Sequence, residues 1–149
     1  MTEAEFAIYR EHLVLAYAEA KVQAGNWPAG DAERLSEEAH QTLLPAGLAT
    51  PAHHFFVARD DGRLVGTLWL AERDGDNGRS AYLYYIEVAE AERGKGYGKA
   101  MLAALEAEVT ALGLDSIQLH VFGDNTTARA LYRDAGYAET NVVMSKRLR

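Results

Sequence analysis

Glycine and basic residues alternate along residues 93–99, in the order Arg-Gly-Lys-Gly-Tyr-Gly-Lys. The glycines let the backbone turn tightly and leave its N–H groups uncovered by side chains. An apolar pattern with helical spacing follows, so these N–H groups lie where a helix begins and its dipole is positive. Arg93, Lys95 and Lys99 add positive charge in a chain whose net charge is −7. The segment predicts a site for a phosphorylated ligand.

Two common phosphate-binding patterns do not fit this loop. A nucleoside-triphosphate loop ends in Gly-Lys-[Ser/Thr], but Gly98-Lys99 is followed by Ala100, which has no hydroxyl group for magnesium. A dinucleotide loop has the spacing Gly-x-Gly-x-x-Gly, but Gly98 follows Gly94 and Gly96 one residue too early. The ligand is therefore expected to be neither a nucleoside triphosphate nor a dinucleotide.

The loop satisfies a third pattern, [Gln/Arg]-x-x-Gly-x-[Gly/Ala], through Arg93, Gly96 and Gly98. In this it resembles the acyl-CoA pyrophosphate loop of the GNAT N-acetyltransferase superfamily. Residues 125–137 resemble a second GNAT segment, Asn-x-x-Ala-x-x-Leu-Tyr-x-x-x-Gly-[Phe/Tyr], with every element in place. Together the two motifs place the resemblance over about residues 53–148.

The elements that must position these motifs follow from hydrophobic spacing and turn residues. Helices are predicted at residues 3–24, 31–44, 100–112 and 126–135. Strands are predicted at residues 53–59, 63–71, 81–88, 115–122 and 142–148, with a loop at 72–79. This order predicts a mixed α/β domain with one central sheet. The resemblance implies a GNAT-like acyl-CoA N-acyltransferase fold with a mixed, mostly antiparallel sheet flanked by helices. The strand that opens many family members is missing here, or a partner supplies its place.

The resemblance also implies a reaction, in which an amine attacks the thioester carbonyl of acetyl-CoA directly. Tyr132 matches the tyrosine that protonates the departing thiolate, and Asn125 matches an asparagine that contacts the cofactor. The backbone of Ile86 and Val88 would pair with the pantetheine amides, where the strand splays away from residues 115–122. The pyrophosphate would be held by Arg93 and the N–H groups of Gly94, Lys95, Gly96, Tyr97, Gly98 and Lys99.

The base that deprotonates the amine stays open between Glu87, His120 and a bridging water. Glu87 lies in an apolar strand near the predicted thioester, where a paired structural carboxylate is an equal alternative. His120 lies at the next strand end, where some relatives that acetylate peptide N-termini carry a glutamate. Histidine titrates near neutrality and suits the role, although a hydrogen-bonded sheet histidine explains it equally well. His12 and His40 are expected at helix surfaces, outside the site.

Composition restricts the functional classes. A length of 149 residues predicts a single domain, residues 1–149. No cysteine is present, which excludes disulfides and thiolate metal sites, and the histidine spacing suggests no metal. The acidic charge argues against nucleic acid as a partner. No apolar run approaches the roughly 18 residues of a membrane span, and the acidic N-terminus does not resemble a signal peptide, so the cytoplasm is the expected compartment.

These observations predict an N-acetyltransferase that uses acetyl-CoA to acetylate a primary amine of a small molecule, a peptide or a protein. The alternative is a non-catalytic acyl-CoA-binding or regulatory module. Tyr132 favours the enzyme, because a binding module needs no acid for a thiolate. A homodimer is also expected, since dimers are common in the family.

Overall fold

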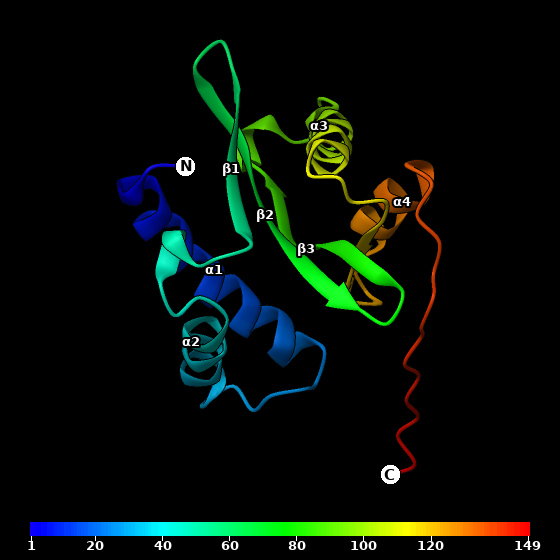
Figure 1. Ribbon diagram of the computed structural model, residues 1–149. Coiled ribbons are helices and arrows are strands. Elements are labelled where there is room, and N and C mark those ends of the chain that lie inside the picture. The colour runs from blue at the N-terminus through cyan, green and yellow to red at the C-terminus, as the bar shows by residue number, and fades with distance from the viewer.

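The computed structural model describes residues 1–149. Figure 1 shows a twisted sheet with two helices on each face. The helices are α1 (Glu3–Gln23), α2 (Ala32–Leu43), α3 (Tyr97–Ala111) and α4 (Thr126–Asp134). The strands are β1 (His53–Asp60), β2 (Arg63–Gly75), β3 (Gly78–Val88) and β4 (Ile117–Leu119). They lie in the order β1-β2-β3-β4, the first three antiparallel and β4 parallel to β3.

No strand precedes α1, so the sheet begins at β1. The start of α1 is fixed by a capping box, in which Thr2 and Glu5 each accept a hydrogen bond from the other's backbone N–H. None of the helices is both long and apolar enough to cross a membrane.

The alternation of side chains along β2 divides the core between the two faces of the sheet. Leu68 and Leu70 pack with Leu102 and Leu105 of α3 in one cluster. Trp69 points to the opposite face, where it packs in the cluster that contains Leu13 of α1. Each face of the sheet is therefore covered by its own apolar layer. Side chains near the end of β3 point either to the α3 face or to the α1 face.

The prediction of a loop at residues 72–79 is wrong, because most of these residues belong to strands. β2 continues to Gly75 and β3 begins at Gly78, which pair across a two-residue turn. Gly78 has φ of 102°, a conformation that glycine adopts without strain. Arg79 forms ion pairs with Glu72 and Asp74 across the hairpin. The charged residues and glycines of this segment are typical of a loop, but here they belong to the exposed end of a β-hairpin.

The C-terminal strands also differ from expectation. Only residues 117–119 of the predicted strand 115–122 are paired, and the predicted strand 142–148 does not form. Residues 138–149 are all exposed and lie outside any helix or strand, and Figure 1 shows them leading away from the sheet. An apolar β pattern becomes a strand only where another strand supplies hydrogen bonds. No such neighbour lies beside this segment.

β3 and β4 separate soon after they meet. Their parallel pairing runs from Ala81 opposite Ile117 to Leu83 opposite Leu119 and stops there. Residues 84–88 of β3 therefore have no partner strand on that side, and the sheet opens toward the loop that precedes α3.

Candidate active site

The loop before α3 presents a row of free backbone donors. The N–H groups of residues 94–99 donate to no backbone or side-chain acceptor. Gly94 and Gly96 have φ of 76° and 87°, and Gly96 is the residue that caps the 15-residue helix α3. A Cβ atom added at either glycine would meet no atom within 4 Å, so the space in front of the loop is open. Unpaired donors at a helix start are the arrangement that attracts anionic groups.

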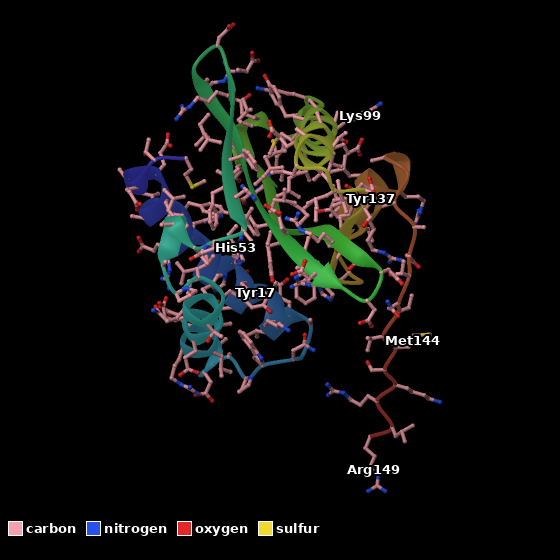
Figure 2. The ribbon with its side chains drawn as sticks, in the orientation of Figure 1. Tyr17, His53, Lys99, Tyr137, Met144 and Arg149 are labelled. Carbon is pink, nitrogen blue, oxygen red and sulfur yellow. The ribbon has the colours of Figure 1, made fainter.

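A buried carboxylate fixes the base of this loop. Glu92 has only 7% of its surface exposed, and its two oxygens pair with Nε of Arg63 at 2.9 Å and Nζ of Lys95 at 3.0 Å. Lys99 forms no ion pair, is exposed, and extends from α3 toward solvent in Figure 2. The role of Glu92 was not predicted from the sequence, because its partner Arg63 lies on β2, far away along the chain.

Gly98 has a different role, since it sits against the neighbouring helix. A Cβ atom at this position would lie 3.2 Å from Cδ2 of Leu131 on α4. The glycine therefore allows α3 to begin close to α4, which carries Tyr132.

Arg93 connects the loop to the end of β3. Its Nε donates to the carbonyl oxygen of Val88 at 3.2 Å, and one terminal nitrogen lies 3.4 Å from Oε1 of Glu87. Ile86 and Val88 are half-buried and pack toward the α3 side, while Glu87 points to the opposite, α1 side. The end of β3 thus presents different residues to the two faces of the sheet.

Glu87 lies in a cluster of polar groups. Its Oε2 lies 2.7 Å from Nε2 of His12 and accepts a hydrogen bond from the Tyr85 hydroxyl at 3.1 Å. Burial, together with the nearby carboxylate, raises the pKa of Tyr85, so this phenol stays protonated and remains a donor. The side chain of Glu87 is 28% exposed, which leaves it open to solvent on one side.

That open side faces a cavity of about 480 Å³ between α1, the β1–β2 hairpin and the end of β3. Its polar lining includes His12, Glu87 and Arg93, and also Glu5, Thr67 and Glu90. Apolar side chains form much of the rest, among them Ile8, Val57 and Leu64. A small molecule with a cationic group and an apolar body would meet complementary surfaces in this cavity.

Tyr132 and Asn125 lie on the other face of the sheet. Tyr132, on α4, is half-buried against the α3-side core, and its ring centroid is 5.7 Å from that of Tyr137. Burial raises the pKa of Tyr132, so the phenol is protonated at neutral pH. Asn125 caps α4 by accepting a hydrogen bond from the Ala128 N–H at 3.1 Å.

Glu87 and His120, the two side chains expected as candidates for the general base, do not lie together in the structure. His120 is exposed just beyond β4, makes no hydrogen bond, and packs edge-on against Phe122 with ring centroids 4.9 Å apart. His12 lies on the exposed surface of α1, as expected, but it contacts Glu87 and so belongs to the candidate site. The expectation that His40 lies at the surface was also wrong, since it is only 4% exposed.

His12 could have been found from its helical spacing. It follows Tyr9 by three residues, so the two side chains share one face of α1. Tyr9 packs against Tyr85 with ring centroids 6.0 Å apart, and this contact brings His12 to the end of β3. The spacing of Tyr9 and His12 is a local feature of the sequence, but Glu87, which His12 contacts, lies 75 residues away.

Comparisons with known proteins agree with this geometry. A model of the Acetyltransferase (GNAT) family matches residues 13–137. The uncharacterized N-acetyltransferase YycN of Bacillus subtilis (strain 168) is 42% identical and aligns with 99% of this chain and 96% of its own. YdgE, an uncharacterized N-acetyltransferase of the same organism, is 36% identical over 99% of this chain and 95% of its own.

Solved structures extend the likeness to three dimensions. The crystal structure of YycN superimposes with a TM-score of 0.94 and covers 99% of this chain and 95% of that one. The structure of an acetyl transferase from Pyrococcus furiosus is 30% identical, with a TM-score of 0.71 and coverage of 94% of both chains. The chain therefore belongs to the acetyltransferase (GNAT) family, and its enzyme class is that of the N-acetyltransferases.

Proposed function

We propose that this protein transfers the acetyl group of acetyl-CoA to a primary amine, by direct attack within a ternary complex. The observation that carries the proposal is the run of unpaired N–H groups at residues 94–99, which lies beside the opened end of β3. A pyrophosphate needs several donors in a small space, and this loop offers them with no side chain in front.

Acetyl-CoA, the donor substrate, would lie along the loop at residues 94–99 and the end of β3. The N–H groups of residues 94–99 would bind the pyrophosphate, and Lys99 would add positive charge. The backbone of Ile86 and Val88, beside which no strand lies on the β4 side, would form hydrogen bonds with the amide groups of the pantetheine arm. The Val88 carbonyl oxygen would exchange its bond to Nε of Arg93 for one to the ligand. Asn125 would contact the same molecule from the start of α4. When bound, acetyl-CoA supplies the thioester that makes the acyl group reactive.

Glu87 would remove the proton that an ammonium group must lose before it can attack. Glu87 lies at the end of a strand, near the place where the sheet opens, and it lines a cavity large enough for an acceptor. Contacts with His12, Tyr85 and Arg93 orient its carboxylate oxygens. A base must first lie within reach of the proton, and among the candidates only Glu87 lines this cavity. His120 takes no part in this proposal.

Tyr132 would give its proton to the thiolate that leaves when the carbon–sulfur bond breaks. Its raised pKa means that the phenol carries its proton at neutral pH, while the same burial makes it a weaker acid, so the role rests on its position on α4 and not on the pKa. The acid would then work from the α4 side of the sheet and the base from the α1 side. In this proposal the thioester would lie where β3 and β4 part, so that groups from both sides of the sheet could reach it.

The acceptor would be an amine that carries an apolar body. Its ammonium group would lie near Glu87, and its apolar part would lie against Ile8, Val57 and Leu64. The experiment is a screen of primary amines with acetyl-CoA, in which free CoA thiol is measured. Amines with hexyl or aromatic bodies should release thiol faster than ethylamine or glycine. Binding of acetyl-CoA with no thiol release for any amine or peptide would favour the non-catalytic binding module.

A further inference from the structure

Side chains of the turn between β1 and β2 reach across to the loop before α3. Asp60 and Arg63 come from the turn, whereas Glu92, Lys95 and Tyr97 come from the loop and the first residue of α3. We call these five residues the turn–loop network. Figure 1 shows the chain passing beside the β1–β2 hairpin on its way from β3 to α3. The network joins segments up to 37 residues apart, so it is a tertiary link and not a local feature of the loop.

Glu92 is the buried centre of the network. One of its oxygens pairs with Nε of Arg63 and the other with Nζ of Lys95. A carboxylate that is taken out of water needs such partners, because the loss of its hydration is costly without them. The side chains of Arg63 and Lys95 are 57 and 54% exposed, so both cations reach the carboxylate from the solvent side. Glu92 therefore ties the beginning of the loop to the β1–β2 turn.

Tyr97 supplies a second link, at the start of α3. Its hydroxyl group donates to Oδ2 of Asp60 and accepts a hydrogen bond from a terminal nitrogen of Arg63 at 3.3 Å. Arg63 thus contacts the chain on both sides of the glycines, at Glu92 before them and at Tyr97 after them. Residues 93–96 are held at both ends by one side chain of the turn.

Holding the loop at both ends matters because its glycines give it unusual freedom. Gly94 and Gly96 both have positive φ, and a glycine loses more conformational entropy than any other residue when it is ordered. A loop that became ordered only on binding would lose affinity to that entropy cost. A loop that is already fixed presents its N–H groups without this cost.

We propose that the β1–β2 turn is a positioning element of the acetyl-CoA site, and that Arg63 acts through Glu92 and Tyr97. Arg63 needs no contact with the ligand in this role. Its neighbour Leu64 lines the acceptor cavity, so one turn contributes to the wall of that cavity and supports the loop that binds the donor. The inference rests on the proposed function, because both concern the same loop.

Arg63→Met tests the positioning role, since it removes the guanidinium group but keeps a long side chain. The Kd for acetyl-CoA, measured by calorimetry, should rise by about 3–10-fold. Arg79→Met is the matched control, because Arg79 is 58% exposed and pairs with two carboxylates, Glu72 and Asp74, away from the loop. The control should leave the Kd unchanged. An unchanged Kd in Arg63→Met, or an equal rise in Arg79→Met, would overturn the proposal.

A double substitution tests whether Arg63 acts through Glu92. Glu92→Gln keeps the size of the side chain but removes its charge, and should raise the Kd by about 10–100-fold. Adding Arg63→Met to Glu92→Gln should then raise the Kd by less than Arg63→Met does alone, because both substitutions break the same contact. Fully additive effects would show that the two residues act independently, and would contradict the network.

Backbone nitrogen relaxation by NMR tests the fixed loop in the protein without ligand. The amides of Gly94 and Gly96 should have order parameters of about 0.85, the value of a rigid backbone. Glu92→Gln should lower them toward about 0.6. Glu72→Gln should leave them unchanged, because Glu72 is also paired with an arginine and a histidine but lies away from the loop. Glycine order parameters that stay the same in Glu92→Gln would overturn the proposal.

These measurements separate the positioning role from a merely structural one and from the proposed function itself. Arg63→Met and Arg79→Met should lower the free energy of unfolding in urea by similar, small amounts, since both side chains are more than half exposed. A difference in Kd between them then cannot come from global stability. If the unsubstituted protein does not bind acetyl-CoA, the proposed function fails, and the relaxation measurement still decides whether the turn positions the loop.

Discussion

Nε2 of His12 lies 2.7 Å from Oε2 of Glu87, which joins the first half of α1 to the end of β3. Tyr85 donates to the same oxygen at 3.1 Å, and Arg93 lies 3.4 Å from the other oxygen. The carboxylate is therefore held from three directions while its remaining side faces the cavity. An oriented carboxylate at the edge of a cavity is a fitting base for a bound ammonium group.

Replacing the carboxylate of Glu87 should remove most of the activity. Glu87→Gln keeps the shape of the side chain but cannot take up the proton, so kcat should fall by about 10²–10⁴-fold. Initial rates of thiol release measure the change. Glu72→Gln is the matched control, since Glu72 is also a strand carboxylate paired with a histidine and an arginine, and it lies outside the cavity. Equal losses in the two variants would contradict the role of Glu87.

His12 should contribute by positioning Glu87. His12→Leu loses a hydrogen bond to a charged group, about 1.5–3 kcal/mol, which corresponds to about 10–100-fold in kcat if the bond is needed in the transition state. The KM for acetyl-CoA should stay unchanged, because His12 lies on the α1 side. His54→Leu, at the equivalent pair with Glu72, should leave kcat as it is. A change in acetyl-CoA affinity with kcat preserved would contradict the positioning role.

The two neighbouring tyrosines of the α4 region should behave differently. Tyr132→Phe removes the proposed acid, so kcat should fall by about 10²-fold while acetyl-CoA affinity changes little. Tyr137→Phe removes a buried hydroxyl group that has no hydrogen-bond partner, so it should be neutral or stabilising and leave kcat unchanged. Single-turnover rates and calorimetric affinities separate the two effects. Unchanged turnover in Tyr132→Phe would remove the tyrosine from the mechanism.

Much of the arrangement around residues 93–99 and 125–137 was predictable from sequence, because local patterns determine it. Glycine spacing and the apolar stripe after it indicated the loop and α3, and the helix predicted at residues 126–135 matches α4 to within one residue. The pairing of His12 with Glu87 was not predictable, because it depends on how α1 crosses the sheet. Residues 142–148 show the opposite failure, in that their apolar pattern predicted a strand but they pair with no other strand.

Two histidines, the buried His40 and the half-buried His53, should make the protein less stable in acid. Burial lowers the pKa of His40 and of His53, and Nδ1 of His53 accepts a hydrogen bond from Nε1 of Trp69 at 2.9 Å, which requires an unprotonated nitrogen. The unfolded chain takes up these protons near pH 6.5, and the folded chain only at lower pH. Because the unfolded state binds more protons, the free energy of unfolding should fall as pH drops below about 6.5.

Urea unfolding between about pH 7.5 and about pH 5.5 measures this dependence. His40→Gln should reduce the slope of stability against pH, because one of the two histidines no longer titrates. A free energy of unfolding that rises toward acid would contradict the assignment of neutral, buried histidines.

The central claim is that the loop at residues 94–99 binds the pyrophosphate of acetyl-CoA. Calorimetry with acetyl-CoA tests it most directly, on the unsubstituted protein, Gly96→Glu and Gly25→Glu. Both glycines have positive φ and open space around a Cβ atom, so the two variants carry the same strain and charge. The unsubstituted protein and Gly25→Glu should bind, and Gly96→Glu should lose binding because a carboxylate fills the anion site. Equal affinity in all three proteins, or binding of ATP without binding of acetyl-CoA, would contradict the claim.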